Sequence, residues 1–381
     1  MKPLEGITVL DLSQFLSAPS ATLRLADLGA HVIKIERPGT GDICRTLYIS
    51  DCVIDGDSSL FHAINRNKES AALDLKDPAS RPTLERLVCE ADVMVVNYRP
   101  GVAERLGVDY ASMSALNPSL VYGEVTGYGK KGPWVDKPGQ DLLAQSLSGI
   151  CWLNGNADQP PTPMGLSVGD LFAGQHLAQG ILAAVFRAKR TGQGAHVEVN
   201  LLTSLLDAQF EVFTTYLNDG RHAPQRSAIN NANAYIDAPY GIYRTANGYL
   251  ALAMIPITKL GELIECPALC EYTDPETWHT KRDEIKAIIA EHLMKRTTAS
   301  WLSILEPADV WCSDVYGWDQ LMDTEAFASL DMIQEVSRAD GTSIATTCCP
   351  ILIDGERPKG GPAAPKVGEQ TERYLTHAPT C

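Results

Sequence analysis

Hydrophobic positions in the first 130 residues follow two alternating patterns. Continuous apolar runs, typical of strands buried in a parallel sheet, occur at Ile7–Ser13, His31–Glu36, Asp92–Tyr98 and Leu120–Thr126, with a weaker run at Ala71–Leu75. Runs with helical periodicity separate them at 19–28, where Pro19 starts the run and Gly29 follows it, and at 81–90. This alternation with short connections predicts an α/β fold with a doubly wound, Rossmann-like sheet.

The pattern becomes helical between Asp141 and Ala188, broken by a Pro/Gly-rich loop at 154–165. A last strand is predicted at 193–202, followed by a helix to about Leu217. Beyond the polar stretch 218–233, we expect a hairpin around 245–248 and helices within 283–305. A chain of 381 residues is too long for one core, because single cores stop growing near ~250–300 residues. We predict a large domain over 1–220 and a smaller α+β domain over about 225–325.

Composition excludes several classes of protein. The net charge of −15 argues against a nucleic-acid partner, which requires a basic patch. We find no signal-like N-terminus and no apolar run of membrane-spanning length, so a cytoplasmic protein without a membrane partner is expected. The ten cysteines and eight histidines are scattered without the spacing of a metal site or a disulfide scaffold, so no metal is predicted.

Residues 127–132 match the dinucleotide-binding pattern G-x-G-x-x-G and follow a strand. A dinucleotide site also needs a helix that opens at the third glycine, but Pro133 and the loop-forming residues 136–139 follow instead. The strand is late in the domain, whereas the fingerprint belongs to the first βα turn. We therefore reject a nicotinamide cofactor. A basic cluster on this loop is a candidate for ligand binding or for plain solvation, and consists of Lys130, Lys131 and Lys137.

Four segments together resemble the family III CoA-transferases, the formyl-CoA:oxalate and carnitine group. They are 27–38 with Gly41, Asp42 and Arg45; 97–107; 126–149; and 165–184. Each segment is modest alone, but their order and spacing are specific over roughly residues 1–202. The resemblance implies a homodimer of two interlocked ring-shaped subunits, in which about 330–381 returns to the large domain. It also implies acyl-CoA and a carboxylic acid as substrates, with no permanently bound cofactor.

The resemblance carries residue roles with it. The family's catalytic aspartate falls on Asp170. Positions that contact CoA fall on Gln14, Phe15, Arg37, Leu73, Asn97, Tyr98, Arg105 and Leu106, and less cleanly on Lys130 and Lys137. Guanidinium groups suit phosphate, so Arg37, Arg99 and Arg105 are phosphate candidates, although each is equally an ordinary surface ion-pair residue. Tyr98 is a candidate for adenine stacking or core packing, and Asn97 for a ligand contact or a turn.

Asp170 precedes a long helical run, so a plain N-cap is the alternative to a nucleophile. We expect the helix dipole to keep this carboxylate ionised. An ionised carboxylate could attack a thioester, form a mixed anhydride and then an aspartyl-CoA thioester. Backbone N–H groups near 127–129 are candidate oxyanion donors. No acyl donor or acceptor is readable from the sequence.

Two positions depart from related branches. Leu16 replaces the glutamine of the oxalate-specific branch, and its glycine-rich flap is missing, which argues against oxalate as acceptor. Gln140 replaces the histidine that acyl-CoA racemases use, and glutamine cannot transfer a proton near neutral pH. A transferase is therefore favoured over a racemase. A non-catalytic CoA-binding paralogue remains the third alternative.

Overall fold

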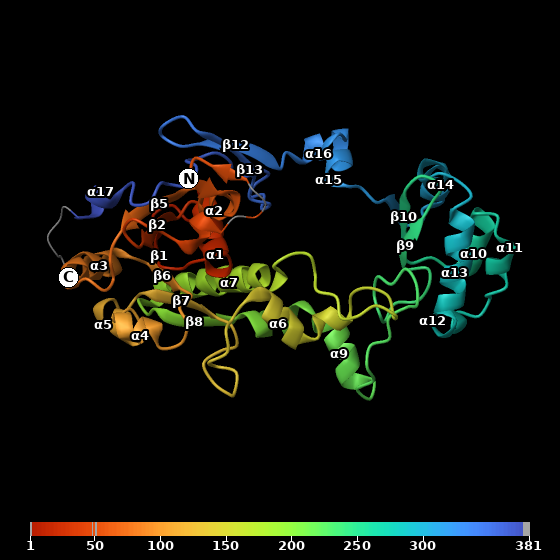
Figure 1. Cartoon of the computed structure of the whole chain (residues 1–381), viewed down its shortest axis with the longest axis horizontal. Helices are drawn as coiled ribbons and strands as arrows, with labels where there is room; N and C mark the ends of the chain where they lie inside the picture. The colour runs from red at the N-terminus through yellow and green to blue at the C-terminus, as the bar shows by residue number, and fades with distance from the viewer. Residues whose placement is uncertain (1, 48, 50–51, 376–381) are drawn as a thin grey trace. The chain divides into compact units, whose positions relative to one another are not determined.

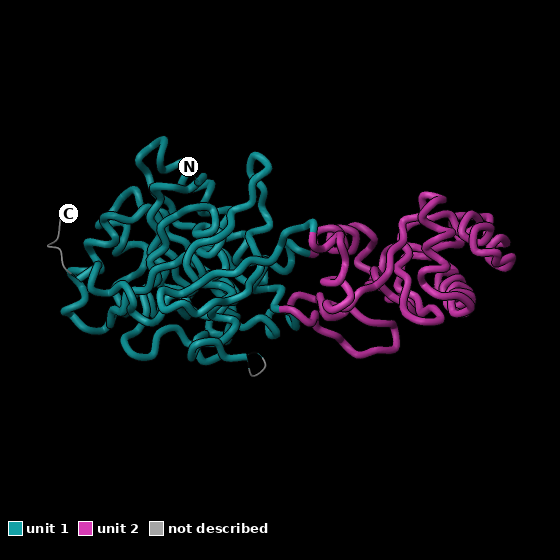
Figure 2. Tube along the Cα trace, turned by 90° about the horizontal axis from the view of Figure 1, so that it is seen from above, with its two compact units in different colours: residues 1–147, 167–208, 329–381 teal, residues 148–166, 209–328 magenta. Residues whose placement is uncertain are grey.

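The computed structural model describes residues 2–47, 49 and 52–375. The chain forms two compact units (Figure 2). Unit 1 contains 1–147, 167–208 and 329–381, and unit 2 contains 148–166 and 209–328. This division differs from the predicted boundaries in two places, since 148–166 and 209–220 lie in unit 2. None of the helices in the described part of the chain is long and apolar enough to span a bilayer.

Unit 1 is built on a six-stranded sheet with the order β5-β2-β1-β6-β7-β8, in which every neighbouring pair is parallel. The predicted parallel α/β sheet is confirmed. The strands are β1 (Thr8–Asp11), β2 (His31–Glu36), β5 (Lys68–Ala72), β6 (Val93–Val96), β7 (Val121–Thr126) and β8 (Ala195–Asn200). β5 begins three residues before the expected 71–75, because Lys68 is a buried strand residue that pairs with Val32. The prediction began too late because Lys68, the first residue of β5, is charged and interrupts the apolar pattern.

Helices cover both faces of this sheet (Figure 1). On one face lie α1 (Ser17–Asp27) and α7 (Val168–Thr191), which pack side by side. On the other face, α3 (Arg81–Glu90) and α5 (Tyr110–Leu116) bury a core that includes Leu10, Met94 and Tyr122. The alternation of side chains along each strand therefore assigns Asp11 and Lys34 to the α1 side.

The C-terminal segment returns to unit 1, where its Arg338 binds Asp57. It contains β12 (Ile333–Ser337) and β13 (Ser343–Thr347), an antiparallel hairpin that we did not predict. The other elements of unit 1 are β3 (Val53–Ile54), β4 (Asp57–Ser58), α2 (Ser59–Asn65), α4 (Val102–Leu106), α6 (Asp141–Ser148, which ends at the unit boundary), α8 (Leu201–Ala208) and α17 (Thr371–Leu375).

Unit 2 has a three-stranded antiparallel sheet with the order β11-β10-β9. Its strands are β9 (Gly241–Arg244), β10 (Tyr249–Leu252) and β11 (Cys312–Asp314), and β9 and β10 form the predicted hairpin. One core around the fully buried Trp301 joins this sheet to its helices. The helices of residues 209–330 are α9 (Phe210–Asn218), α10 (Ile257–Leu263), α11 (Pro267–Cys270), α12 (Thr277–Thr280), α13 (Arg282–Leu293), α14 (Thr298–Leu305), α15 (Trp318–Met322) and α16 (Glu325–Leu330).

Candidate active site

Asp170 is the third residue of α7 and lies in unit 1. Its side chain is partly buried, and the Ser17 hydroxyl lies close enough to lower its pKa. Among the described residues, no lysine, arginine or histidine contributes to its electrostatic environment as a partner. A partly desolvated carboxylate without a cationic partner is energetically unfavourable, and such groups concentrate at functional sites.

Asp141, and not Asp170, caps α7. Its Oδ1 atom accepts a hydrogen bond of 2.7 Å from the backbone N–H of Gly169, and Oδ2 accepts one of 2.7 Å from Gln145. Ser167, the residue in the N-cap position, makes no side-chain cap. A Cβ atom on Gly169 would lie 3.0 Å from the capping oxygen, so glycine permits this close approach. The N-cap alternative for Asp170 is therefore wrong, and its carboxylate is left for other contacts.

The electrostatic environment of Asp170 opposes ionisation. Burial, followed by the like charge of Asp141, raises the pKa of Asp170 to about 7, and the hydrogen bond from Ser17 offsets part of this rise. The expectation that the helix dipole alone keeps Asp170 ionised is thus wrong, because desolvation dominates. At neutral pH the carboxylate exists in both protonation states.

The N-terminus of α1 is brought to Asp170 by a glycine. Gly174 lies one turn after Asp170 on α7, and a Cβ atom there would lie 2.5 Å from the Ser17 carbonyl oxygen and 2.1 Å from Ser20 Oγ. Without this side chain, α1 can pack directly on α7. Ser17 is the first residue of α1, and the residue before it, Leu16, provides no side-chain cap. The first N–H groups of α1 therefore lack a side-chain acceptor at its N-cap, close to the serine that contacts Asp170.

Several predicted CoA contacts meet where the strand order reverses, between β1 and β6. Open parallel sheets bind ligands at this position, outside the carboxyl ends of the strands. Gln14 and Phe15 follow β1, and Asn97 and Tyr98 follow β6. The Asn97 side chain donates to the Gln14 carbonyl at 2.6 Å and accepts from the Gln14 N–H at 2.9 Å. The structure thus joins two residues that lie 83 positions apart in the chain.

The predicted phosphate ligands are exposed beyond the carboxyl ends of the same sheet. Arg37 follows β2 directly, Arg99 lies in the loop after β6, and Arg105 is in α4. None of the three forms an ion pair with a carboxylate in the described part of the chain. Their guanidinium groups therefore keep their donors for an anionic ligand.

Three predicted contacts are tied to the core instead. Leu73 is 3% exposed and its side chain belongs to the core between the sheet and α3, so its predicted contact with CoA would be made by its backbone. Its backbone N–H donates to the Glu36 carbonyl at 2.9 Å. Tyr98 and Leu106 pack partly buried against the same core, and burial raises the pKa of Tyr98 to about 12.

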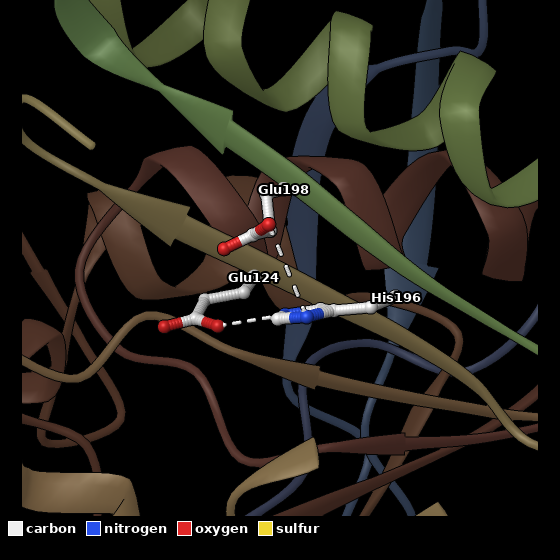
Figure 3. Close-up of side chains that lie close together, drawn as sticks. All are labelled: Glu124, His196 and Glu198. Atoms are coloured by element: carbon white, nitrogen blue, oxygen red, sulfur yellow. Dashed lines mark hydrogen bonds and ion pairs between the residues drawn. The ribbon is translucent and has the colours of Figure 1, made fainter. Parts of the chain in front are cut away.

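Lys130 pairs with two glutamates at the β7–β8 edge. Both glutamates, Glu124 and Glu198, lie beside His196 (Figure 3). The Nζ atom of Lys130 lies 2.6 Å from Glu124 and 3.3 Å from Glu198, and Glu124 also accepts from His196 at 2.9 Å. The glutamates and His196 have metal-ligating chemistry and lie close together, but the ammonium group of Lys130 already compensates the carboxylates. Gly123 faces Ile181 of α7, so Glu124 projects from the opposite face of the sheet. Lys137 instead lies over the ring of Trp134.

The loop of residues 127–139 makes no dinucleotide site, since α6 begins only at Asp141. One predicted oxyanion donor is already used, because the Gly129 N–H donates to Thr126 Oγ1 at 3.0 Å. Gln140 is exposed and its Oε1 atom accepts from the N–H of Leu142.

Sequence reasoning missed Ser17 and the capping role of Asp141. Asp141 is 28 residues from Gly169, so no local pattern could pair them. The only sequence signal was the helical spacing from Asp141 to Gln145, which places both side chains on one face.

Comparisons with known proteins identify the family of this chain. The sequence profile of CoA-transferase family III matches residues 4–371. Acetyl-CoA:oxalate CoA-transferase of Acetobacter aceti is 33% identical over 97% of this chain and 94% of its own length. Succinyl-CoA:mesaconate CoA-transferase of Haloarcula marismortui is 32% identical over 99% of this chain and 97% of its own length.

Solved structures have the same fold. Rv3272 from Mycobacterium tuberculosis superposes with a TM-score of 0.84 at 28% identity, covering 99% of both chains. A CAIB/BAIF family protein from Brucella suis gives a TM-score of 0.83 at 28% identity, covering 98% of both chains. Profile, relatives and fold agree along the whole chain, so the protein is an enzyme that belongs to CoA-transferase family III.

Proposed function

We propose that this enzyme transfers CoA from an acyl-CoA donor to a carboxylic acid, with Asp170 as the covalent nucleophile. The observation that carries the proposal is the state of Asp170: it is partly buried, has no cationic partner among the described residues, does not cap α7 because Asp141 does, and has a pKa of about 7. An ionised carboxylate in such a place is weakly solvated and can attack a thioester carbonyl.

The reaction would proceed in four balanced steps. The ionised carboxylate of Asp170 attacks the donor's acyl carbon and expels CoA thiolate, which leaves a mixed anhydride. The thiolate attacks the aspartyl carbonyl, which releases the donor's carboxylate and forms an aspartyl-CoA thioester. The acceptor carboxylate attacks this thioester, which gives a second anhydride and thiolate. The thiolate then attacks the acceptor's acyl carbon, which yields the new acyl-CoA and restores Asp170.

The chain's own residues have distinct tasks in this scheme. Ser17 and the first N–H groups of α1 would stabilise negative charge that develops beside Asp170, as an oxyanion site does. Arg37 and Arg105 would bind CoA phosphates, together with Arg99 and Lys137. Gln14 and Phe15 would contact CoA at the switch point between β1 and β6. Holding thiolate and anhydride together is worth up to ~7–11 kcal/mol.

The acceptor would be a small carboxylic acid. The named acceptors of the relatives include oxalate and mesaconate, while Leu16, which precedes Ser17 in the chain, has an apolar side chain that packs partly buried against the cluster around Phe61. An apolar residue there favours an acid with hydrocarbon next to its carboxylate over oxalate. A panel of acyl-CoA donors and acids, with mass detection of new thioesters, would identify the pair.

The homodimer implied by the resemblance is also proposed. Apolar side chains support it, because α9 has no buried residue and its Phe210 is 69% exposed. Light scattering after size exclusion should give twice the chain mass.

The nucleophile is tested by trapping. The enzyme would be incubated with donor acyl-CoA and quenched with hydroxylamine, and peptide mass mapping should place a hydroxamate on Asp170. Asp170→Asn, which keeps the shape of the side chain, should give no adduct and no transfer. An unlabelled Asp170 in an enzyme that turns over would refute the mechanism. Exchange of the α-proton without transfer would instead indicate a racemase, which Gln140 cannot support as a general base.

A further inference from the structure

The turn between β1 and α1 contains a strained residue. Phe15 has a φ angle of 63°, in the left-handed region that non-glycine residues avoid. Its side chain is 48% exposed, so packing around the ring does not account for this conformation. The turn leads directly to Ser17, which contacts Asp170. Something other than local preference must hold Phe15 in place.

Hydrogen bonds from neighbouring strands hold this turn. The Asn97 amide binds both the N–H and the carbonyl of Gln14, the residue before Phe15. Asp42 Oδ1 accepts from the Phe15 N–H at 3.3 Å. The amide of Asn97 thereby uses one donor and its acceptor on the backbone across the switch point.

Buried charges support the same turn from below. The fully buried Lys34 donates to the Ser13 carbonyl at 2.7 Å and pairs with Asp42 at 2.8 Å. Asp11, also fully buried, accepts from the Ser13 N–H and pairs with Lys68. Buried ion pairs contribute little net stability, so their value here is in fixing geometry. Every described polar backbone contact from Ser13 to Phe15 ends on one of these side chains or on Asn97.

We propose that Asn97 is a positioning residue for catalysis and not a ligand of the CoA nucleotide. It holds Phe15 in the left-handed conformation, and so keeps Ser17 and the first turn of α1 against Asp170. This inference rests on the proposed function of Asp170. Loss of the clamp lets Phe15 relax, which moves the start of α1 away from the reacting carboxylate.

The test is a double-mutant cycle between Asn97→Ala and Phe15→Gly, read as kcat and KM for CoA transfer. Glycine adopts positive φ without strain. Asn97→Ala should lower kcat about tenfold in the wild-type background, with a smaller change in KM for acyl-CoA, and clearly less in the Phe15→Gly background. If the alanine variant folds poorly, Asn97→Asp is measured in its place. It keeps the acceptor and loses the donor, so its kcat should lie between those of wild type and a variant without the clamp.

Asn117→Ala is the matched control. Asn117 also donates from its side-chain amide to backbone carbonyls, those of Val88 and Ala91, but lies away from the turn. Its loss should lower stability, leave kcat unchanged and show no coupling to Phe15→Gly. A raised KM with unchanged kcat in Asn97→Ala would show a nucleotide ligand and overturn the proposal, as would additive effects in the cycle. These outcomes can be told apart from a failure of the proposed function. If Asp170 is not the nucleophile, the wild-type enzyme forms no adduct at Asp170, whatever the Asn97 variants do.

Discussion

The Oδ1 atom of Asp141 lies 2.7 Å from the backbone nitrogen of Gly169 and caps the helix that carries Asp170. Asp141 therefore caps this helix, a role that the sequence alone would assign to Asp170. The same contact places a negative charge beside Asp170 and helps to raise its pKa. One side chain thus both caps α7 and contributes to the raised pKa of Asp170.

The pH dependence of transfer should follow the ionisation of Asp170. In the proposed mechanism only the ionised form attacks, so kcat/KM should rise with pH with a midpoint near the pKa of about 7. Asp141→Asn removes the like charge and keeps an oxygen that can accept from Gly169, so the midpoint should move to lower pH. A pH–rate profile of both enzymes measures this, and an unmoved midpoint would argue against coupling of the two carboxylates.

Replacing Asp170 with asparagine should stabilise the protein at high pH. The pKa of Asp170 is raised from 3.8 to about 7, so the folded state keeps a proton that the unfolded state releases near pH 4. Stability linked to this group therefore declines as pH rises from about 4 to about 7. Asp170→Asn removes the decline and should gain up to roughly 4 kcal/mol at pH 8. Urea unfolding at pH 5 and pH 8 should show a larger gain at pH 8, and an equal gain at both would contradict the raised pKa.

Gly174→Ala should separate α1 from α7. The new methyl group would lie 2.5 Å from a backbone oxygen of Ser17, which cannot move without the helix, so a loss of ~1–3 kcal/mol is expected. Transfer should fall as well, because Ser17 leaves Asp170. Gly180→Ala is the control in the same helix, since its methyl group meets Val197 of β8 instead. It should lose stability but retain kcat per folded molecule, and a similar kcat loss in both variants would count against a specific role for the α1 contact.

Two lysines of one loop should behave differently. Lys137 has no carboxylate partner among the described residues, so Lys137→Ala should raise KM for acyl-CoA about two- to tenfold, with an effect that shrinks at high salt. Lys130 compensates Glu124, whose side chain is 10% exposed, so Lys130→Ala should mainly lower the free energy of unfolding. Steady-state kinetics and denaturation of both variants distinguish the roles. A larger KM effect at Lys130 would show that it leaves its glutamates for CoA.

The sequence could predict what depends on local pattern. Strand and helix alternation, the hairpin around 245–248 and the helix that follows Asp170 are all confirmed. The missed hairpin of β12 and β13 carries an Asp340-Gly341 turn between alternating strands, a signal that was present and overlooked. The extent of β5 was misjudged because Lys68 is buried with Asp11, a pairing across 57 residues.

The site was predicted less completely, because it too depends on contacts between residues far apart in the sequence. Asp170 could be named from its motif, but its freedom depends on the distant Asp141. Leu73 was named as a ligand contact, yet its burial is decided by the packing of α3 on the sheet. Side chains that act through space, such as Ser17 on Asp170, have no sequence signature.

The return of the C-terminal segment to unit 1 determines the order in which parts of this enzyme can fold during synthesis. Arg45 donates to the Pro365 carbonyl, and Arg338 binds Asp55 and Asp57, so the first and last parts of the chain complete each other's charges. While the chain is still emerging from the ribosome, Asp55 and Asp57 lack Arg338. Residues 209–328 can meanwhile form their own core, because all of it is synthesised consecutively. Unit 1 can therefore complete these contacts only after residues 338–365 have been synthesised, which is later than the residues that form the core of unit 2.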